Sequence, residues 1–312
     1  MRDGFADGAD ETDRANSILV LIRSIRSISE SFYIACRLKE RHFHKTRIAP
    51  TPSGYLHLGN AYSFLLTQAL AQRTNAKILL RIDDLDAQRV RKEYLDDIFD
   101  TLNFLEIAYD EGPRDFGEYE TGYAQRHRMH LYEDALQKLM NKGLVYACRC
   151  SRTSLEGHPC ACDLENIPFN TPQTALRLRT GDEELAVRTP DRGVVTASLP
   201  LEMKDFIVRK KDGMPAYQLA SMLDDVHFGI DLIVRGEDLW ASTLAQLYLA
   251  EKLNAAAFLN TTFYHHALIG DKENGKLSKS AGALSVQALR REGKSLTDIL
   301  SLPQMRALRE FQ

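Results

Sequence analysis

The first well-patterned stretch of the chain alternates strand-like and helix-like segments, and this order constrains the fold more than any other feature of the sequence. A short apolar run at 46–50 leads through a turn-rich loop to Asn60, a favourable helix N-cap. Helical spacing occupies 61–73, an apolar run of strand length occupies 76–82, and a second helical pattern occupies 94–105. This β-loop-α-β-α order predicts an α/β fold with a doubly wound parallel sheet, whose site lies at the carboxyl ends of the strands.

The pattern changes between residues 140 and 200, where cysteines and prolines cluster and the strand-like runs are short. We interpret this part as an insertion, because strand-like runs followed by helical patterns return at 205–209 and 231–235. The sequence therefore predicts five segments. They are a poorly ordered N-terminal extension at 1–45, the first half of a Rossmann-like domain at 46–139, the insertion at 140–200, the second half at 201–270, and a lysine-bearing loop with the start of a helical segment at 271–312.

Composition limits the class of protein. The 312 residues are 44% hydrophobic and 27% charged, which is typical of a globular protein, and the formal net charge is −3. Any nucleic-acid contact must therefore use local basic surface, and the stretch 276–312 offers one. No apolar run approaches the ~18 residues that span a bilayer, and the first residues are too acidic for a leader peptide. We expect a cytoplasmic monomer without a membrane segment.

Two loops carry residue types that suit phosphate chemistry. In the first, Gly54 and Gly59 lack a Cβ where a backbone must approach a nucleotide, and the following helix presents free N–H groups to phosphate. His57 of the same loop is placed to donate to an α-phosphate oxygen. In the second, Lys276 and Lys279 stand three residues apart among small hydroxyl residues, which suits a loop that neutralises a departing pyrophosphate. Each loop alone is equally typical of an ordinary connector.

Four of the five cysteines, Cys148, Cys150, Cys160 and Cys162, fall within 15 residues as two Cys-x-Cys pairs. Thiolates this close in a chain without a secretory signal are better explained by tetrahedral zinc than by disulfides. His158 is a spare candidate ligand. The alternative is a set of four reduced thiols without a metal.

Taken together, these segments resemble the class I aminoacyl-tRNA synthetases, and within them the glutamyl branch. The resemblance covers roughly residues 46–286 and rests on four motifs in the order that this branch has. They are Arg47-Ile-Ala-Pro-Thr-Pro-Ser-Gly54 leading into His57-Leu-Gly-Asn60, Arg81-Ile-Asp-Asp-Leu-Asp86, the run from Asp212-Gly-Met-Pro-Ala-Tyr-Gln-Leu-Ala220 through Asp224-Asp225 to Val234-Arg-Gly-Glu-Asp238, and Lys276-Leu-Ser-Lys-Ser280. Only about 30 residues follow the last motif, so the chain most resembles the short glutamyl-queuosine tRNA(Asp) synthetases, which have no anticodon-binding domain.

The resemblance implies a role for each matching residue. Arg47, Tyr217 and Arg235 are expected to bind a substrate carboxylate, which a planar guanidinium meets in a bidentate way. The α-amino group of the substrate is assigned to Ala49, Thr51 and Asp83. ATP is assigned to His57, Gly59, Asn60, Lys276 and Lys279, with His57 and the two lysines as the catalytic residues and magnesium assisting. Glu237 and Asp238 are expected either to orient Arg235, to contact the RNA end, or to be purely structural.

The expected reaction joins L-glutamate to ATP, giving glutamyl-adenylate, and then transfers glutamate to tRNA. The favoured acceptor is the wobble queuosine of tRNA(Asp). The alternatives are a truncated glutamyl-tRNA synthetase that charges the 3′ end of tRNA(Glu), and an inactive tRNA-binding paralogue. Three departures from the family pattern bear on activity, namely Asp83 in place of glutamate, Asn60 in place of histidine and Thr51 in place of serine.

Overall fold

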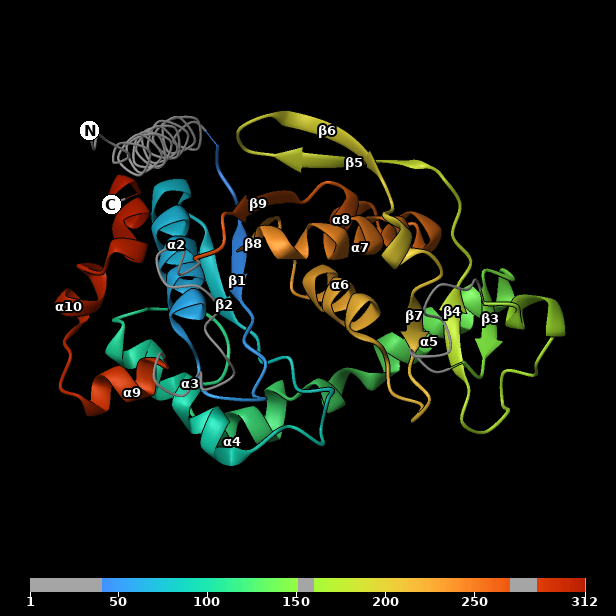
Figure 1. Cartoon of the computed structure of the whole chain (residues 1–312), viewed down its shortest axis with the longest axis horizontal. Coiled ribbons are helices and arrows are strands. Elements are labelled where there is room, and N and C mark those ends of the chain that lie inside the picture. The colour runs from blue at the N-terminus through green and yellow to red at the C-terminus, as the bar shows by residue number, and fades with distance from the viewer. Residues whose placement is uncertain (1–40, 151–159, 270–284, 312) are drawn as a thin grey trace, which may run out of the picture.

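The computed structural model describes residues 41–150, 160–269 and 285–311 (Figure 1). At its centre, strand β1 (Lys45–Ile48) pairs in parallel with β2 (Lys77–Leu80), and helix α2 (Leu58–Thr74) connects the two. Three of the four residues of each strand are buried. A parallel pair requires a crossover connection of this kind, so the predicted β-loop-α-β order is confirmed.

A second parallel pair continues this arrangement. Strand β8 (Leu232–Gly236) pairs in parallel with β9 (Thr262–His266), and helices α7 (Trp240–Leu253) and α8 (Ala256–Leu259) lie between them in the chain. The two pairs adjoin, since the amide of Asp231 donates to the carbonyl of Lys45 at 3.1 Å. The carboxyl ends of β1, β8 and β9 therefore face the same edge of the molecule.

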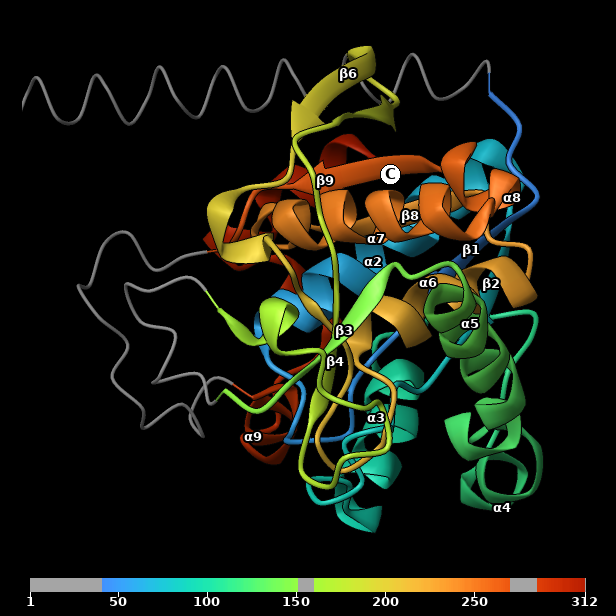
Figure 2. The ribbon, with the colours of Figure 1, turned by 90° about the vertical axis from the view of Figure 1, so that its right-hand side faces the viewer.

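The remaining strands are mostly antiparallel, so the sheets of the molecule are mixed. Strands β3 (Val145–Cys148), β4 (Ala175–Leu178) and β7 (Ile207–Arg209) form one antiparallel sheet. Strands β5 (Glu184–Thr189) and β6 (Gly193–Ser198) form a hairpin, and β5 also meets β9 in parallel. Figure 2 shows β3 and β4 apart from the layer that holds α7 and β9.

The other helices complete the elements of the described residues. They are α3 (Lys92–Phe104), α4 (Phe116–Glu118), the π-helix η1 (Tyr119–Tyr123), η2 (Gln125–Arg128), α5 (Met129–Asn141), η4 (Cys162–Glu165), η5 (Leu201–Met203), α6 (Tyr217–His227), η6 (Glu237–Leu239), α9 (Val286–Arg291), α10 (Leu296–Leu300) and η8 (Pro303–Glu310). No helix in the described part of the chain, including α2, α7 and α8, is long and apolar enough to cross a membrane. The predicted division of the chain at residues 45, 139, 200 and 270 stays a prediction.

Two large hydrophobic clusters hold these elements together. The first packs the β3-β4-β7 sheet and α5 against α6 and α7, so the predicted insertion shares its core with the second half of the chain. The second packs α2 against β1, β2 and the C-terminal helices, and its buried members include Leu66, Val286 and Phe311. Neighbouring residues of one strand belong to different clusters, with Ile233 of β8 in the first and Val234 in the second, so the strands that end at the cleft are held by both.

Helix α2 begins earlier than the sequence predicts. His57, not Asn60, is the N-cap, and its Nδ1 accepts from the amide of Gly59 at 3.1 Å. Asn60 occupies the third helical position, where its Oδ1 accepts from the amide of His57 at 3.0 Å. The prediction of Asn60 as N-cap is therefore wrong, because an unprotonated imidazole nitrogen can serve as the capping acceptor and leave the asparagine to close a reciprocal capping box.

Candidate functional site

A cleft of about 390 Å³ lies where β1, β8 and β9 end and α2 begins. This position agrees with the general rule that parallel sheets bind ligands outside the carboxyl ends of their strands. The cleft is lined by Arg47, Ile48, Ala49, His57, Gly59, Asn60, Ser63, Phe64, Thr67, Tyr217, Val234, Arg235, Gly236, Asp238, Leu239, His266, Leu268 and Ile269. Residues separated by more than 200 positions therefore meet in one hollow.

Arg235 is the least satisfied charged group of the cleft. The residue is 4% exposed, and its guanidinium lies over the ring of Phe263, with the central carbon 5.1 Å from the ring centroid. Its Nη1 donates to the Oε1 of Gln246 at 3.0 Å, whereas Nε and Nη2 are buried without a hydrogen-bond partner. Burial lowers the pKa of Arg235 to about 10, and the nearby Arg47 also lowers it. A buried cation with two unused donors is suited to bind an anion from outside the chain.

The neighbouring arginines are paired with carboxylates instead. Arg47 donates through Nε to the Oδ1 of Asp225 at 3.2 Å and through Nη1 to the carbonyl of Val234 at 3.2 Å. Arg81 donates to the same Asp225 oxygen at 2.7 Å. Burial lowers the pKa of Arg81, but the charges of Asp83 and Asp225 outweigh it, so this pKa lies well above its usual value. Asp225 thus fixes the Arg47 guanidinium at the wall of the cleft.

Asp83 is paired with an arginine within the protein. Both of its carboxylate oxygens accept from Arg81, at 2.7 and 3.0 Å, and the residue does not line the cleft. Thr51 is exposed and does not line the cleft either. The signal for the ion pair was in the sequence, because residues i and i+2 of an extended segment point to the same side. The contact of Asp83 and Thr51 with an amino group stays a prediction.

The structure brings most of the other predicted site residues together. Arg47, Ala49, His57, Gly59, Asn60, Tyr217 and Arg235 all line the cleft. Lys276 and Lys279 lie outside the described residues. Sequence reasoning missed Gln246, whose only signal was its place eleven residues after Arg235 on the following helix, and it did not give Asp225 a role.

The geometry of His57 fixes its hydrogen-bonding role. Since Nδ1 accepts from the Gly59 amide, the ring proton of the neutral form is on Nε2, which leaves an N–H donor. Burial lowers the pKa of His57, which favours this neutral form. An added Cβ at Gly59 would lie 2.9 Å from the imidazole Cε1, so a larger residue there would displace His57 from its capping position.

The first loop is anchored to the C-terminal segment beside the cleft. The amide of Val286 donates to the carbonyl of Leu56 at 2.8 Å, and His57 and Ser285 form an isolated antiparallel bridge. Ile269 lines the cleft itself. The described residues on both sides of 270–284 therefore adjoin the site, although the lysine motif between them is outside the described part of the chain.

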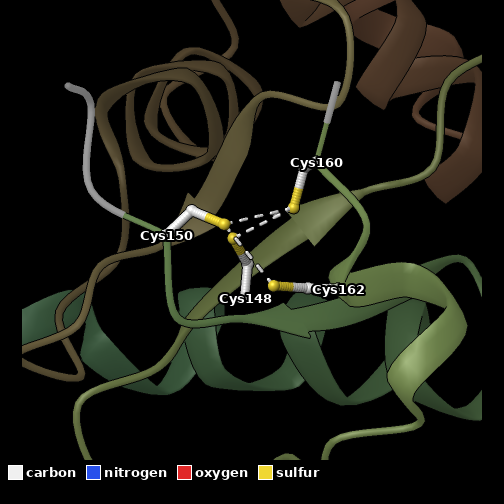
Figure 3. Close-up of side chains that lie close together, drawn as sticks. All are labelled: Cys148, Cys150, Cys160 and Cys162. Atoms are coloured by element: carbon white, nitrogen blue, oxygen red, sulfur yellow. Dashed lines mark hydrogen bonds between the residues drawn. The ribbon is translucent and has the colours of Figure 1, made fainter. Parts of the chain in front are cut away.

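The four clustered cysteines form a second candidate site, at the β3-β4-β7 sheet (Figure 3). Their sulfur atoms all lie within 4.8 Å of one another, with Cys148 and Cys160 at 3.4 Å, Cys150 and Cys160 at 3.7 Å, and Cys150 and Cys162 at 3.5 Å. Four sulfurs around tetrahedral zinc at about 2.3 Å would be spaced by about 3.8 Å, so this donor set fits the ion.

A cationic neighbour completes this second site. Arg177 of β4 donates through Nε to the sulfur of Cys148 at 3.3 Å. Burial raises the pKa of the Cys148 thiol, but the contact with Arg177 and hydrogen bonding outweigh it, so that this pKa lies below its usual value. A positive donor beside a metal-binding sulfur offsets part of the negative charge that four thiolates carry. His158, the spare ligand of the sequence prediction, is outside the described residues.

Comparison with known proteins supports the assignment of the fold and shows the family. The family model of class I tRNA synthetases (E and Q), catalytic domain, matches residues 44–167 and 163–309. The chain is 33% identical over 268 residues to a glutamate–tRNA ligase from Sulfurihydrogenibium, covering 80% of this chain and 55% of the relative. It is 34% identical over 272 residues to a glutamyl-Q tRNA(Asp) synthetase from Nitratidesulfovibrio vulgaris, covering 81% of this chain and 83% of the relative.

A solved structure gives the same fold. The glutamate–tRNA synthetase of Elizabethkingia anophelis superposes with a TM-score of 0.64 at 26% identity, covering 77% of this chain and 53% of that one. The chain thus spans about half the length of this protein and of the glutamate–tRNA ligases that it matches.

Proposed function

The chain belongs to the family of class I tRNA synthetase catalytic domains of the E and Q type, and from this premise we propose that it activates L-glutamate with ATP and transfers it to a tRNA. The observation that carries the proposal is the free edge of Arg235. Its Nε and Nη2 are buried, lack a partner and belong to a residue that lines the cleft. A side chain that ends in a carboxylate supplies the charge and the two acceptors that this edge requires.

The remaining groups of the cleft suit the rest of an amino-acid and nucleotide complex. Arg47, held by Asp225, adds a second positive charge, and the hydroxyl of Tyr217 adds a donor. At the other wall, the Nε2–H of His57 offers a donor to the phosphates of ATP, and the N-terminus of α2 adds the partial positive charge of the helix dipole. In this arrangement, the α-carboxylate of glutamate lies between the two groups of donors, near the α-phosphorus.

The chemistry needs positioning and charge stabilisation rather than a covalent nucleophile. An oxygen of the glutamate α-carboxylate attacks the α-phosphorus, the bond to the bridging oxygen breaks, and pyrophosphate leaves with that electron pair. A hydroxyl group of the tRNA then attacks the carbonyl carbon of the mixed anhydride, loses its proton to solvent and expels AMP. Lys276 and Lys279 are proposed to neutralise the pyrophosphate.

Magnesium and zinc have separate places in this proposal. Of the described residues that line the cleft, only Asp238 carries a carboxylate, so magnesium would be held mainly by the ATP phosphates and water. Zinc would be held by Cys148, Cys150, Cys160 and Cys162. There it would cross-link the carboxyl end of β3 to the start of η4. A site closed by four sulfurs leaves no open position, so its role is structural.

For the acceptor, we propose the wobble queuosine of tRNA(Asp). The support is the 34% identity to a glutamyl-Q tRNA(Asp) synthetase over 272 residues, 81% of this chain. The second candidate is the 3′ end of tRNA(Glu), which the matches to glutamate–tRNA ligases favour.

The first experiment is ATP–pyrophosphate exchange with L-glutamate, with L-glutamine and L-aspartate as controls, each with and without tRNA. Exchange that depends on glutamate supports the proposed activation step. If no amino acid supports exchange under any condition, the chain does not activate an amino acid and the inactive paralogue is correct.

The second experiment locates the transferred group. Purified enzyme is incubated with labelled glutamate and either queuosine-containing tRNA(Asp) or tRNA(Glu), and the labelled nucleoside is identified after digestion. Label on queuosine supports the proposed acceptor, whereas label on the terminal adenosine of tRNA(Glu) alone establishes the alternative.

A further inference from the structure

Gln246 of α7 is fully buried and touches the group that carries the proposed function. Its Oε1 accepts from the Nη1 of Arg235 at 3.0 Å, while its Nε2 is buried without a hydrogen-bond partner. An arginine has only donors, so the amide oxygen must face it and the orientation of the Gln246 amide is settled. The pair of Arg235 and Gln246 therefore has three donor nitrogens without a partner, namely Nε2 of Gln246 and the Nε and Nη2 of Arg235.

The partner of Arg235 differs from the partners of the other buried arginines at the site. Arg47 and Arg81 share Asp225, and Arg128 donates to both oxygens of Asp224. Each of these cations is therefore offset by a carboxylate. Arg235 has a neutral amide in the same place, so it is held in position without losing its charge.

Two contacts leave one edge of Arg235 available. The ring of Phe263 covers one face of the guanidinium, and Gln246 occupies Nη1. Nε and Nη2 lie on the adjoining edge, which is the edge that meets a carboxylate in a bidentate way. The direction in which this edge points thus depends on the hydrogen bond from Nη1 to Gln246.

We propose that Gln246 is a specificity-determining residue, which orients Arg235 without neutralising it and thereby makes the cleft select a side-chain carboxylate over a side-chain amide. This inference rests on the proposed function and adds the basis on which glutamate is preferred to glutamine. With a glutamate at position 246, Arg235 would form an ion pair with that carboxylate. A substrate carboxylate would then meet a pair whose net charge is zero and would be attracted less strongly. A glutamine substrate would lose no comparable attraction.

The decisive variants are Gln246→Glu and Gln246→Met. In ATP–pyrophosphate exchange, Gln246→Glu is expected to raise the KM for glutamate at least about tenfold, with little change in the KM for glutamine or for ATP. Gln246→Met keeps the charge of Arg235 and loses its orientation. It is expected to lower kcat/KM for glutamate by about five- to tenfold while glutamate remains preferred to glutamine.

Gln218→Glu is the matched control. Gln218 is on α6, where its Nε2 donates to the hydroxyl of Ser242 of α7 at 3.1 Å, so the same charge is introduced beside the same helix without touching Arg235. The preference of the Gln218→Glu variant for glutamate over glutamine is expected to stay within about twofold of that of the unmodified chain. The thermal unfolding midpoint of each variant shows that it is folded.

The results separate this inference from the proposed function. If the unmodified chain is active and Gln246→Glu keeps the full preference for glutamate, Gln246 is not a specificity determinant. If the unmodified chain supports no exchange, the proposed function fails, and calorimetric binding of L-glutamate and L-glutamine to the same variants still decides the inference. A loss of preference for glutamate in Gln246→Glu alone, by either measurement, supports it.

Discussion

The cleft at the strand ends and the cysteine cluster are both incomplete, but they lack opposite things. In the cleft, Arg235 presents buried donors that have no acceptor, so the missing partner is an anion. In the cluster, four sulfurs lie within 4.8 Å of one another, and as thiolates they would repel, so the missing partner is a cation. An incomplete site thus identifies the charge of its ligand through the groups that it leaves unsatisfied.

The two regions are also assembled differently. The cysteines come from one short window of the sequence, whereas Arg47, Arg235 and Gln246 come from three elements. A ligand of the cysteine cluster therefore joins neighbouring segments and stabilises the fold. A ligand of the cleft is held between elements that their own hydrophobic clusters already fix. We expect damage to one region to affect stability and damage to the other to affect activity.

Arg235→Met gives the largest expected effect and tests this separation directly. Loss of a bidentate, charge-assisted contact is expected to lower kcat/KM for glutamate by about a hundred- to a thousandfold in pyrophosphate exchange. The thermal midpoint is expected not to fall by more than a few degrees, because methionine replaces a buried charge that lacks a carboxylate partner.

Arg209→Met is the control for this prediction. Arg209 belongs to β7 of the cysteine-bearing sheet, and it too has a buried Nε without a hydrogen-bond partner. The same substitution there is expected to leave the KM for glutamate within about twofold. A large loss of stability in Arg235→Met, with activity reduced only in proportion, would contradict the separation.

Cys150→Ser tests the other half of the comparison. Zinc analysis is expected to find one ion per chain, and none in this variant, because a three-sulfur site binds zinc weakly. The free energy of unfolding is expected to fall by about 2–3 kcal/mol in chemical denaturation. The KM for glutamate, measured below the unfolding transition, should be unchanged, and Cys36→Ser is the matched control.

The dependence of stability on pH gives the smallest expected effect. It tests the region around Arg235, where His265 is buried. Burial lowers the pKa of His265 to about 3 from an ordinary 6.5, and the charges of Arg235, His266 and Arg192 also lower it. Between those values the unfolded chain binds more protons than the folded one, so the stability that neutral His265 contributes is present above pH 6.5 and declines below it.

From pH 7.5 to 5.5 this loss amounts to about 1 kcal/mol, to be measured as a shift of the urea midpoint. His265→Phe should reduce the total shift by this amount, leaving the part due to His57 and His266, whose pKa values burial also lowers, and the exposed His130→Gln should not reduce it. The comparison is made in the Cys150→Ser background as well, so that loss of zinc in acid does not contribute. An unchanged shift in His265→Phe would show that other groups cause it.

Local patterns predicted much of this structure, and contacts between distant segments did not follow from them. Strands at β1 and β2 were predicted because apolar runs bounded by turn residues are a local signal. The cysteine cluster was also predicted from a local signal, because its four cysteines fall within 15 residues of one another. The contact of Gln246 with Arg235 depends on how α7 packs beside β8, and an isolated glutamine gives no pattern from which to infer it.

Competition between partners accounts for a second difference and bears on one untested assignment. Asp83 accepts two hydrogen bonds from Arg81 on the same face of the segment, and its predicted contact with a substrate amine stays a prediction. Asn60 was preferred as a helix cap by residue type, but His57 lies one turn earlier and its ring nitrogen can accept. Residue type alone indicates which role is possible, and the nearest competing partner decides whether it is taken.

The hydrogen bond from Val286 to Leu56 has a consequence for the order in which the protein folds during synthesis. Val286, Met305 and Phe311, which bury the outer side of α2, follow Leu56 by more than 200 residues in the chain. Until the ribosome has released these later residues, that apolar face of α2 stays open to water and to chaperones. The loop that carries Leu56 and His57 therefore gains this support long after its own synthesis.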